Sequence, residues 1–176
     1  MTSSDKIKER AKTAKKREAS YGPDLNIDEY TTSDSEPRRI DDVDELSASD
    51  RDIVRDVGFD TEQKSVSGSF IQFDNESILA DVLIKQEGLE LLPVSQALKQ
   101  YDWLHDYLWN AVSVDTDKYT ATSELERYDG YFIRAHAGAR IEMPVQTCLV
   151  MKRDKSLQNV HNIIIAEEGS EMHIVT

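Results

Sequence analysis

Four histidines are the residues of this chain best suited to hold a metal ion: His105, His136, His161 and His173. Imidazole is the commonest metal ligand among protein side chains. No two of these histidines have a close ligand spacing such as HxH, so a metal site would need ligands that converge from separate strands. Each histidine is better explained as a half-exposed residue of a strand or helix. We therefore assign no catalytic residue and keep the histidines only as candidate metal ligands.

The segment GYFIRAHAGARIE is similar to part of the first metal-binding motif of the cupins. Its first glycine, His136 and Glu142 have the spacing of that motif, but Gly138 stands where the second histidine ligand should be. The loss of one imidazole from a site of three or four ligands usually abolishes high affinity. The segment still defines an alternative function, a cupin-like metal-dependent enzyme that uses His136, Glu142 and either His161 or His173.

Cys148 is the only cysteine. An internal disulfide is therefore excluded, and so are a zinc site of several thiolates and an iron–sulfur cluster held by this chain's own cysteines, which need three or four thiolates. The thiol lies within the apolar stretch PVQTCLVM, where burial raises the pKa of a cysteine and lowers its reactivity. A packing role is favoured over a nucleophile or a sulfur acceptor.

The charge of the chain is unevenly distributed. The formal net charge is −13, yet residues 1–20 carry seven Lys/Arg against three Asp/Glu, which leaves −17 on the remainder. Such a body repels nucleic acid and anionic membranes, so neither is expected as a partner. The basic segment Lys6–Arg17 could dock an acidic partner, which defines a second alternative, a non-catalytic interaction module. We favour a simpler interpretation, in which this segment is a surface helix packed on its own domain.

Two further exclusions follow from hydropathy. No apolar stretch approaches the roughly 18–20 residues that cross a bilayer, and no hydrophobic segment follows the charged N-terminus as in a secretory signal. We therefore expect a cytoplasmic protein.

Hydrophobic periodicity and turn residues predict the elements that would position these side chains. Residues 5–19 are helix formers with a thin apolar face, and 20–48 have the composition of an acidic linker. Residues 49–58 predict a short helix that Ser49 caps and a glycine ends. Residues 67–93 alternate as short strands around an Asp-Asn turn. Residues 93–112 predict the longest helix, because apolar residues recur at spacings of three and four.

After Gly130 the pattern changes to runs of three to six apolar or β-branched residues between polar turns. These runs predict four or five strands, at about 130–135, 140–143, 145–151, 160–166 and 171–176. Successive strand–turn units of comparable length are typical of a β-solenoid or a sandwich.

Four segments resemble the SufB/SufD family of iron–sulfur cluster assembly proteins, particularly its shorter archaeal-type members. They are SGSFIQFDN, ALKQYDWLHDYLWNAVSVDTDKYTA, GYFIRAHAGARIEMPVQTC and, most clearly, VHNIIIAEEGSEMHIVT. They occur in the family's order, and the similarity runs from about Ser49 to the end. The resemblance implies an α+β fold, with a helical N-terminal region followed by a right-handed parallel β-helix (β-solenoid).

The resemblance also implies a function. The chain would be a scaffold component of SUF-type cluster assembly, not an enzyme, and would work with a SufC-like ABC-type ATPase and a SufB/SufD-like partner chain. No cofactor is expected on this portion, although full-length family members would carry an iron–sulfur cluster transiently. Cys148 falls on no family motif with a catalytic role, and the resemblance leaves open whether the chain is B-like or D-like.

Family members normally continue after the HIVT strand, so we expect this chain to be a truncated, N-terminal portion. Its expected domains are a basic helix with a partly disordered acidic linker over 1–48, a helical and mixed region over 49–129, and the first rungs of a β-helix over 130–176. Ile174 and Val175 would then lie at an open sheet edge. Unpaired edges promote association, so self-association through this edge is expected.

Overall fold

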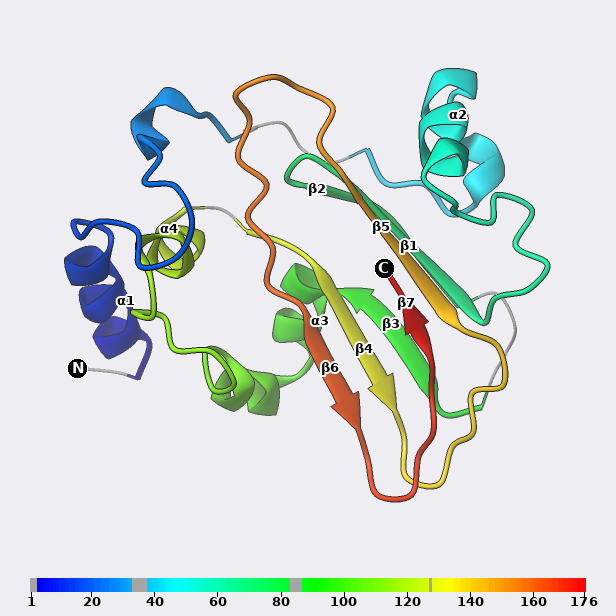
Figure 1. Ribbon diagram of the computed structural model, residues 1–176. Helices are drawn as coiled ribbons and strands as arrows, with labels where there is room; N and C mark the ends of the chain where they lie inside the picture. Colours follow the sequence, from blue (N-terminus) through cyan, green and yellow to red (C-terminus); the bar gives the residue numbers. More distant parts are fainter. Residues whose placement is uncertain (1–2, 33–37, 83–86, 127) are drawn as a thin grey trace.

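The computed structural model describes residues 3–32, 38–82, 87–126 and 128–176. Two small mixed sheets form its centre (Figure 1). One has the strand order β2-β1-β5-β7 and the other the order β3-β4-β6. The strands are β1 (Gly68–Phe73), β2 (Glu76–Asp81), β3 (Leu89–Pro93), β4 (Tyr131–Ala135), β5 (Val145–Val150), β6 (Ile163–Ala166) and β7 (Ile174–Val175).

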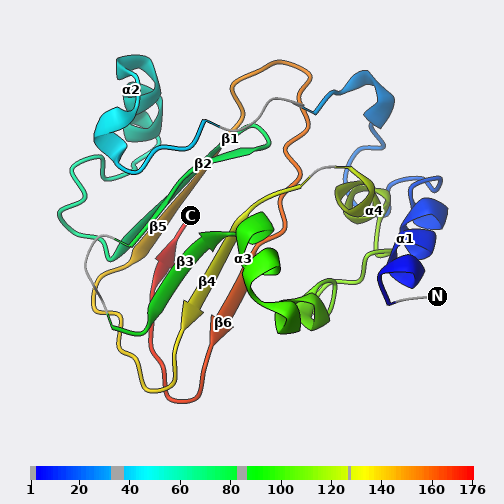
Figure 2. The ribbon, with the colours of Figure 1, turned by 180° about the vertical axis from the view of Figure 1, so that it is seen from behind.

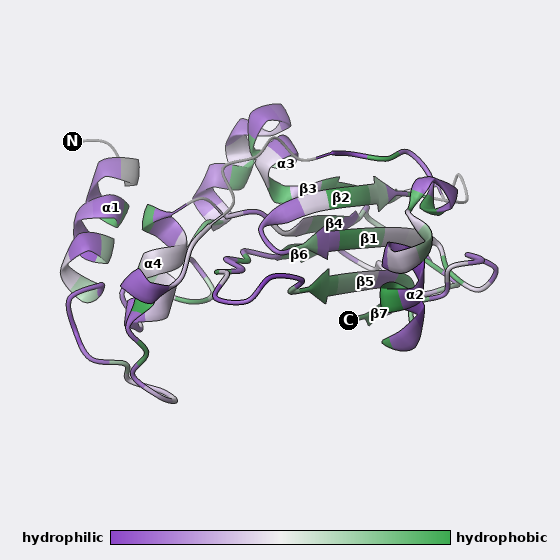
Figure 3. Ribbon diagram, turned by 90° about the horizontal axis from the view of Figure 1, so that it is seen from above, coloured by the Kyte–Doolittle hydropathy of each residue, from purple (hydrophilic) through white to green (hydrophobic). Residues whose placement is uncertain are grey.

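The helices are α1 (Ser3–Ala14), α2 (Ala48–Asp56), α3 (Val94–Gln100) and α4 (Lys118–Leu125), with 3-10 turns η1 (Ile27–Glu29), η2 (Val43–Glu45) and η3 (Asp102–Tyr107). The view from behind shows α2 at one side of the sheets and α1 with α4 at the other (Figure 2). In the view from above, β1 and β5 are largely hydrophobic and α1 is largely hydrophilic (Figure 3). None of the helices in the described ranges is long and apolar enough to span a membrane.

The prediction of a right-handed parallel β-helix is wrong. Each sheet is mixed: β1 pairs antiparallel with β2 and parallel with β5, and β3 pairs antiparallel with β4, which pairs parallel with β6. No solenoid is evident in the described residues. The sheets are assembled from strands before and after position 130, instead of from turns of the C-terminal segment alone. Strand–turn units of similar length do not specify which strands pair or in which direction, and the prediction failed there.

The hairpin of β1 and β2 has the Asp-Asn turn that the sequence predicts, at Asp74 and Asn75. Asp74 has a φ of 49°, in the left-handed region that Asp tolerates better than most residues. Its side chain is buried and accepts hydrogen bonds from the backbone N–H groups of Lys152 (2.8 Å) and Arg153 (3.2 Å) and from Ser156 Oγ (3.2 Å). The turn therefore fixes the loop that follows β5.

The space between the two sheets is filled by one apolar cluster. Phe70 and Val145 of the first sheet meet Leu91, Tyr131 and Ile133 of the second. The Phe70 and Tyr131 rings make an edge contact with centroids 5.5 Å apart. Strands β1 and β4 are buried along nearly all of their length because both faces are covered, and in β1 this burial includes the polar side chains of Ser69 and Gln72.

The longest predicted helix, over 93–112, is broken in the structure. Helix α3 ends at Gln100, Tyr101 is extended with φ −126° and ψ 97°, and the chain continues as η3. The break lets Tyr101 donate a hydrogen bond to Glu90 (2.5 Å) while Leu104 still reaches the core. Tertiary contacts thus override a periodicity that fits one continuous helix.

Helix α2 forms close to its predicted position, but its N-cap is Ser47, whose hydroxyl accepts from the Asp50 N–H, and not Ser49. The segment predicted as linker, 20–48, contains η1 and η2, and Ile40 and Val43 are buried in the core beside α2. Residues 33–37 of that segment lie outside the described residues.

Helix α1 packs on α4, as the simpler interpretation of the basic segment expects. Ala11 and Ala14 are fully buried against Ala121 of α4 and Val114 before it. At the edges of this contact, Arg10 pairs with Asp115 (2.5 Å) and Lys15 with Glu126 (2.8 Å).

Candidate functional site

The largest gathering of charged side chains around a candidate histidine lies on the three-stranded sheet. It comprises Glu90, Tyr101, Arg134, His136 and Glu167, and we call it the His136 cluster. His136 Nε2 lies 2.5 Å from Glu90 Oε1, and His136 Nδ1 lies 3.9 Å from Glu167 Oε2. The site therefore combines one imidazole, one guanidinium and two carboxylates.

Strand register brings these residues together. Glu90 of β3 and Arg134 of β4 are directly opposite one another, and Glu167 directly follows β6 on the other side of β4. Arg134 donates from Nε to Glu167 (2.7 Å) and from Nη1 to Glu90 (3.2 Å). Its guanidinium also lies over the Trp103 ring, 5.3 Å from the centroid. Arg134 is thus the central residue that both carboxylates share.

The electrostatics of the cluster favour the ionised form of Glu167 and the protonated form of Tyr101. The hydrogen bond from Arg134 is the main cause that lowers the pKa of Glu167, and the Ala137 N–H adds to it. The hydrogen bond to Glu90 raises the pKa of Tyr101, because the phenol must stay protonated to donate it. The two carboxylates therefore already accept hydrogen bonds from Arg134, Tyr101 and a backbone N–H.

These hydrogen bonds and ion pairs limit what the cluster can do chemically. A metal ion would have to compete with the Arg134 guanidinium for both carboxylates. In the described parts of the chain, no three His, Cys, Asp or Glu side chains are placed to hold a metal ion. The arrangement is that of an ion-pair network which joins three strands.

The structure scatters the candidate metal ligands. His136 belongs to the cluster, whereas Glu142 and His173 are exposed and His161 lies in a separate groove. His105 Nε2 lies 3.1 Å from the Leu98 carbonyl oxygen, within the turn that follows α3.

His161 packs among aromatic rings. The Trp109 ring meets it edge to face with centroids 4.5 Å apart, and the Tyr128 centroid is 5.6 Å away. The Trp109 indole N–H donates to Glu124 (2.7 Å). Burial lowers the pKa of His161, and burial also raises the pKa of Tyr128 to about 12. The imidazole is therefore neutral at neutral pH.

We expect an NMR titration of His161 to give a pKa below its ordinary value of 6.5. Because the folded-state pKa is the lower one, the unfolded chain binds more protons as the pH falls through 6.5, and the free energy of unfolding decreases there. The titrating imidazole Cε1–H resonance, assigned through His161→Gln, provides the measurement. A pKa at or above 6.5 would contradict the packing described.

Cys148 is buried on β5, and burial raises the pKa of its thiol. It lines a small hollow of about 250 Å³ beside Phe59 and Val175. Its environment fits the packing role that the sequence predicts.

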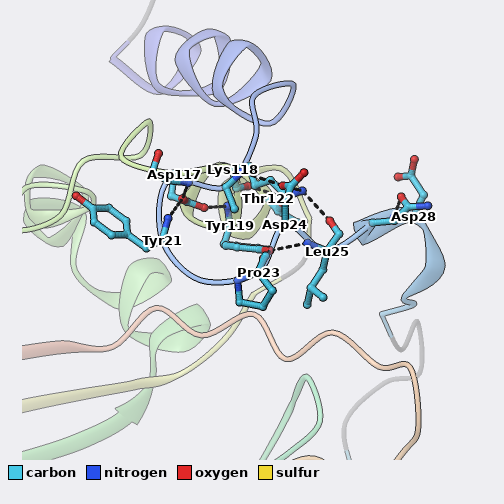
Figure 4. A network of polar contacts seen from close by, with 12 residues as sticks. Tyr21, Pro23, Asp24, Leu25, Asp28, Asp117, Lys118, Tyr119 and Thr122 are labelled. Carbon is cyan, nitrogen blue, oxygen red and sulfur yellow. Dashed lines mark hydrogen bonds and ion pairs between the residues drawn. The ribbon is translucent and has the colours of Figure 1, made fainter.

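A second polar network holds the N-terminal segment on α4 (Figure 4). Asp117, the N-cap of α4, accepts from the Tyr119 N–H (2.9 Å) and from the N–H groups of Ser20 (2.5 Å) and Tyr21 (3.3 Å). Lys118 forms an ion pair with Asp24 and donates to the Leu25 carbonyl (2.6 Å). The charges of this network are paired within the protein, so its role is structural. We call the contacts of Asp117 and Lys118 with residues 20–25 the Asp117 clasp.

Replacing Arg134 by methionine should lower the free energy of unfolding by about 1–3 kcal/mol, because it leaves Glu90 and Glu167 partly buried without their cation. Chemical denaturation measures this change. The matched control is Arg140→Met: its pair with Glu171 spans 3.3 Å between side chains that are 76% and 67% exposed, so we expect a change within about 0.5 kcal/mol. Equal effects of the two substitutions would contradict a structural role for the cluster.

The Arg134→Met variant should also change how the free energy of unfolding decreases at acid pH. The pKa of Glu167 is lowered in the fold, so its contribution is present above the ordinary value of 4.5 and is lost as the pH falls below it. In Arg134→Met, denaturation midpoints measured between pH 6 and pH 3 should decline less steeply than in the parent chain. An unchanged slope would assign the acid sensitivity to other carboxylates.

Of the residues in the His136 cluster, only His136 is predicted as a site residue from the sequence, and the other four are found by the structure: Glu90, Tyr101, Arg134 and Glu167. The signal that could have found Glu90 and Arg134 is their opposite charge within otherwise apolar strands, which indicates a cross-strand pair.

No protein-family model matches the chain. Comparison with curated proteins finds archaeal relatives named iron-sulfur cluster assembly SufBD family proteins. The relative from Methanothermobacter thermautotrophicus (Delta H) is 37% identical over 95% of this chain and 42% of its own length. The one from Archaeoglobus fulgidus is 38% identical over 72% of this chain and 34% of its own length, and the one from Pyrococcus horikoshii is 24% identical over 79% and 32%. The chain thus spans about two fifths or less of these relatives.

Proposed function

Because the chain belongs to the SufBD family of iron–sulfur cluster assembly proteins, we propose that it acts as a non-catalytic scaffold component of SUF-type cluster assembly in the cytoplasm. It works with a SufC-like ABC-type ATPase and with a SufB/SufD-like chain. The single observation that carries this proposal is the 37% identity over 95% of the chain to a protein with that family name.

The cysteine content of the chain indicates that other protein segments must supply most of the ligands of an iron–sulfur cluster. An iron–sulfur cluster is held by about four cysteine thiolates, and this sequence has one cysteine. The cluster is therefore a cargo whose ligands come mainly from elsewhere. Within the described residues, the His136 cluster and the Asp117 clasp use their charges to join strands and helices, which fits a framework better than a reaction centre.

Depletion of the chain in its host tests the assembly role. We expect the activity of an iron–sulfur-dependent dehydratase to fall while the amount of its polypeptide stays constant, and re-expression of the chain to restore it. An unchanged dehydratase activity on depletion would overturn the proposal.

A separate experiment tests the ATPase partner. The affinity-tagged chain, expressed at native level, should co-purify with an ABC-type ATPase and with a second SufBD-type chain, both identified by mass spectrometry. Recovery of the tagged chain without either of them would overturn the partner assignment and leave the assembly role to be judged by the depletion experiment.

A further inference from the structure

Buried polar side chains gather where the β1–β2 hairpin turns. Gln72, Asn75 and Ser77 are 0%, 1% and 1% exposed. Asn75 Oδ1 accepts a hydrogen bond from the backbone N–H of Asn159 (3.0 Å). Two other oxygen atoms of this group, Gln72 Oε1 and Ser77 Oγ, have no hydrogen-bond partner among the described residues. A buried oxygen without a partner needs an explanation.

The two oxygen atoms belong to side chains that are opposite one another. Gln72 of β1 is paired with Ser77 of β2, so their Cβ atoms lie roughly 4.5–5.5 Å apart on one face of the sheet. Phe70 is on the same face, because side chains two residues apart on a strand point the same way, and Phe70 packs against the second sheet. Strand β2 is the edge of its sheet opposite β7, so the pair lies away from the C-terminal end of the chain.

The orientation of the Gln72 amide is determined by its neighbours. Its Nε2 donates to the Asp74 carbonyl oxygen (3.1 Å), which also accepts from Gln158 Nε2 (2.7 Å). Turning the amide over would place Oε1 against that carbonyl, and two acceptors cannot form a hydrogen bond. Gln72 Oε1 therefore points away from Asp74 and needs a donor from elsewhere.

A water molecule has the hydrogen-bonding groups that this pair lacks. An amide oxygen only accepts, whereas a hydroxyl both donates and accepts. One water can donate to Gln72 Oε1 and form a second hydrogen bond with Ser77 Oγ. Proteins hold internal waters at about one per 27 residues, usually bonded to polar groups of this kind. A metal ion is less suitable, because both side chains are uncharged and its charge would be buried without compensation.

We propose that Gln72 Oε1 and Ser77 Oγ together bind one internal water molecule, which joins β1 to β2 on the face that packs against the second sheet. The water donates to Gln72 and forms a hydrogen bond with the Ser77 hydroxyl. It is thus a structural component of the hairpin whose turn fixes the loop after β5. The inference does not depend on the assembly role.

The sign of the stability change in Ser77→Ala tests the proposal. If the hydroxyl binds water, the variant loses a hydrogen bond, and the equilibrium constant of unfolding should increase about three- to tenfold. If the hydroxyl has no partner at all, its removal relieves a desolvation cost, and the constant should stay the same or decrease. Urea denaturation of the purified 176-residue chain measures the constant.

Thr147→Val is the matched control. Thr147 Oγ1 is also buried and has no partner among the described residues. Its neighbour across β1 is Phe70, which offers no polar group to share a water. Valine keeps the shape of threonine, so we expect the equilibrium constant of unfolding to stay the same or to decrease up to about tenfold. The two substitutions should therefore have opposite signs.

Two further measurements detect the water itself. The amplitude of ¹⁷O magnetic relaxation dispersion reports long-lived internal waters, and it should fall by the contribution of one water in Ser77→Ala but not in Thr147→Val. A crystal structure of the parent chain should show a water about 2.7–3.2 Å from both Gln72 Oε1 and Ser77 Oγ.

Several results would overturn the inference. These are an unchanged or smaller unfolding constant in Ser77→Ala, an increase of the same size in both variants, an unchanged dispersion amplitude in Ser77→Ala, or a crystal structure in which no water contacts both atoms. A parent chain that is stabilised by K⁺ and not by Na⁺, with the effect lost in Ser77→Ala, would assign the two oxygen atoms to a cation instead.

Discussion

Replacing Phe132 by alanine should lower the free energy of unfolding by about 3–5 kcal/mol, the largest effect of any single truncation that we expect. Phe132 is fully buried in β4, on the face of the sheet that α3 and η3 cover. Its ring centroid lies 5.9 Å from that of Tyr101 and 6.4 Å from that of Trp103. Removal of the ring would leave a cavity beneath two aromatic side chains that cannot close it without moving η3.

Thermal and chemical denaturation measure this effect. For a chain of this size the loss corresponds to a decrease of roughly 6–20 °C in the midpoint temperature. The control is Val112→Ala, at a side chain that is 53% exposed, for which we expect a change within about 0.5 kcal/mol. A loss below about 1 kcal/mol for Phe132→Ala would contradict the packing of η3 on β4.

Replacing Asp74 by alanine should cost about 3 kcal/mol, because it removes the acceptor for several donors at once. The carboxylate is 5% exposed and also accepts from Arg153 Nε (2.8 Å). Burial by itself would raise the pKa of Asp74, but the hydrogen bonds from Lys152, Arg153 and the guanidinium outweigh it and lower the pKa. The charged form is therefore the one that the fold stabilises.

Two comparisons sharpen this prediction. Asp74→Asn keeps one acceptor oxygen and should have an intermediate effect, whereas Asp154→Ala, at an exposed position of the same loop, should change the free energy of unfolding by less than about 0.5 kcal/mol. Since the pKa of Asp74 is lowered in the fold, its contribution is present above the ordinary value of 3.8 and is lost as the pH falls. Equal stability of Asp74→Ala and the parent at pH 7 would refute the network.

Local signals in the sequence predicted several elements correctly. The Asp-Asn turn, the strands that became β4 and β5 and the short helix α2 each follow from residues that are adjacent or a few positions apart. The strand expected at 140–143 is reduced to a single bridge between Arg140 and Glu171. The family assignment also came from sequence, and the archaeal relatives confirm it.

Pairing between distant segments was not predictable in the same way. Strand direction depends on which segments meet, and β1 finds an antiparallel neighbour in β2 and a parallel one in β5. The His136 cluster depends on the same information, because a shift of one residue in the register of β3 would turn Glu90 to the other face of the sheet. The sequence shows that His136 and Arg134 are present, but it does not show that Glu90 and Glu167 are the residues they pair with.

The buried apolar side chains form separate clusters, and the one between α1 and α4 consists mainly of alanine and valine. So small a contact gives little free energy per residue, and the ion pairs at its edges are partly exposed to solvent. We therefore expect α1 to detach from α4 at a lower temperature than the sheets unfold, while the hydrogen bonds to Asp117 and Lys118 still hold the 20–25 segment on α4. Calorimetry should then record a broad first transition, shifted to lower temperature by added salt, ahead of the main endotherm.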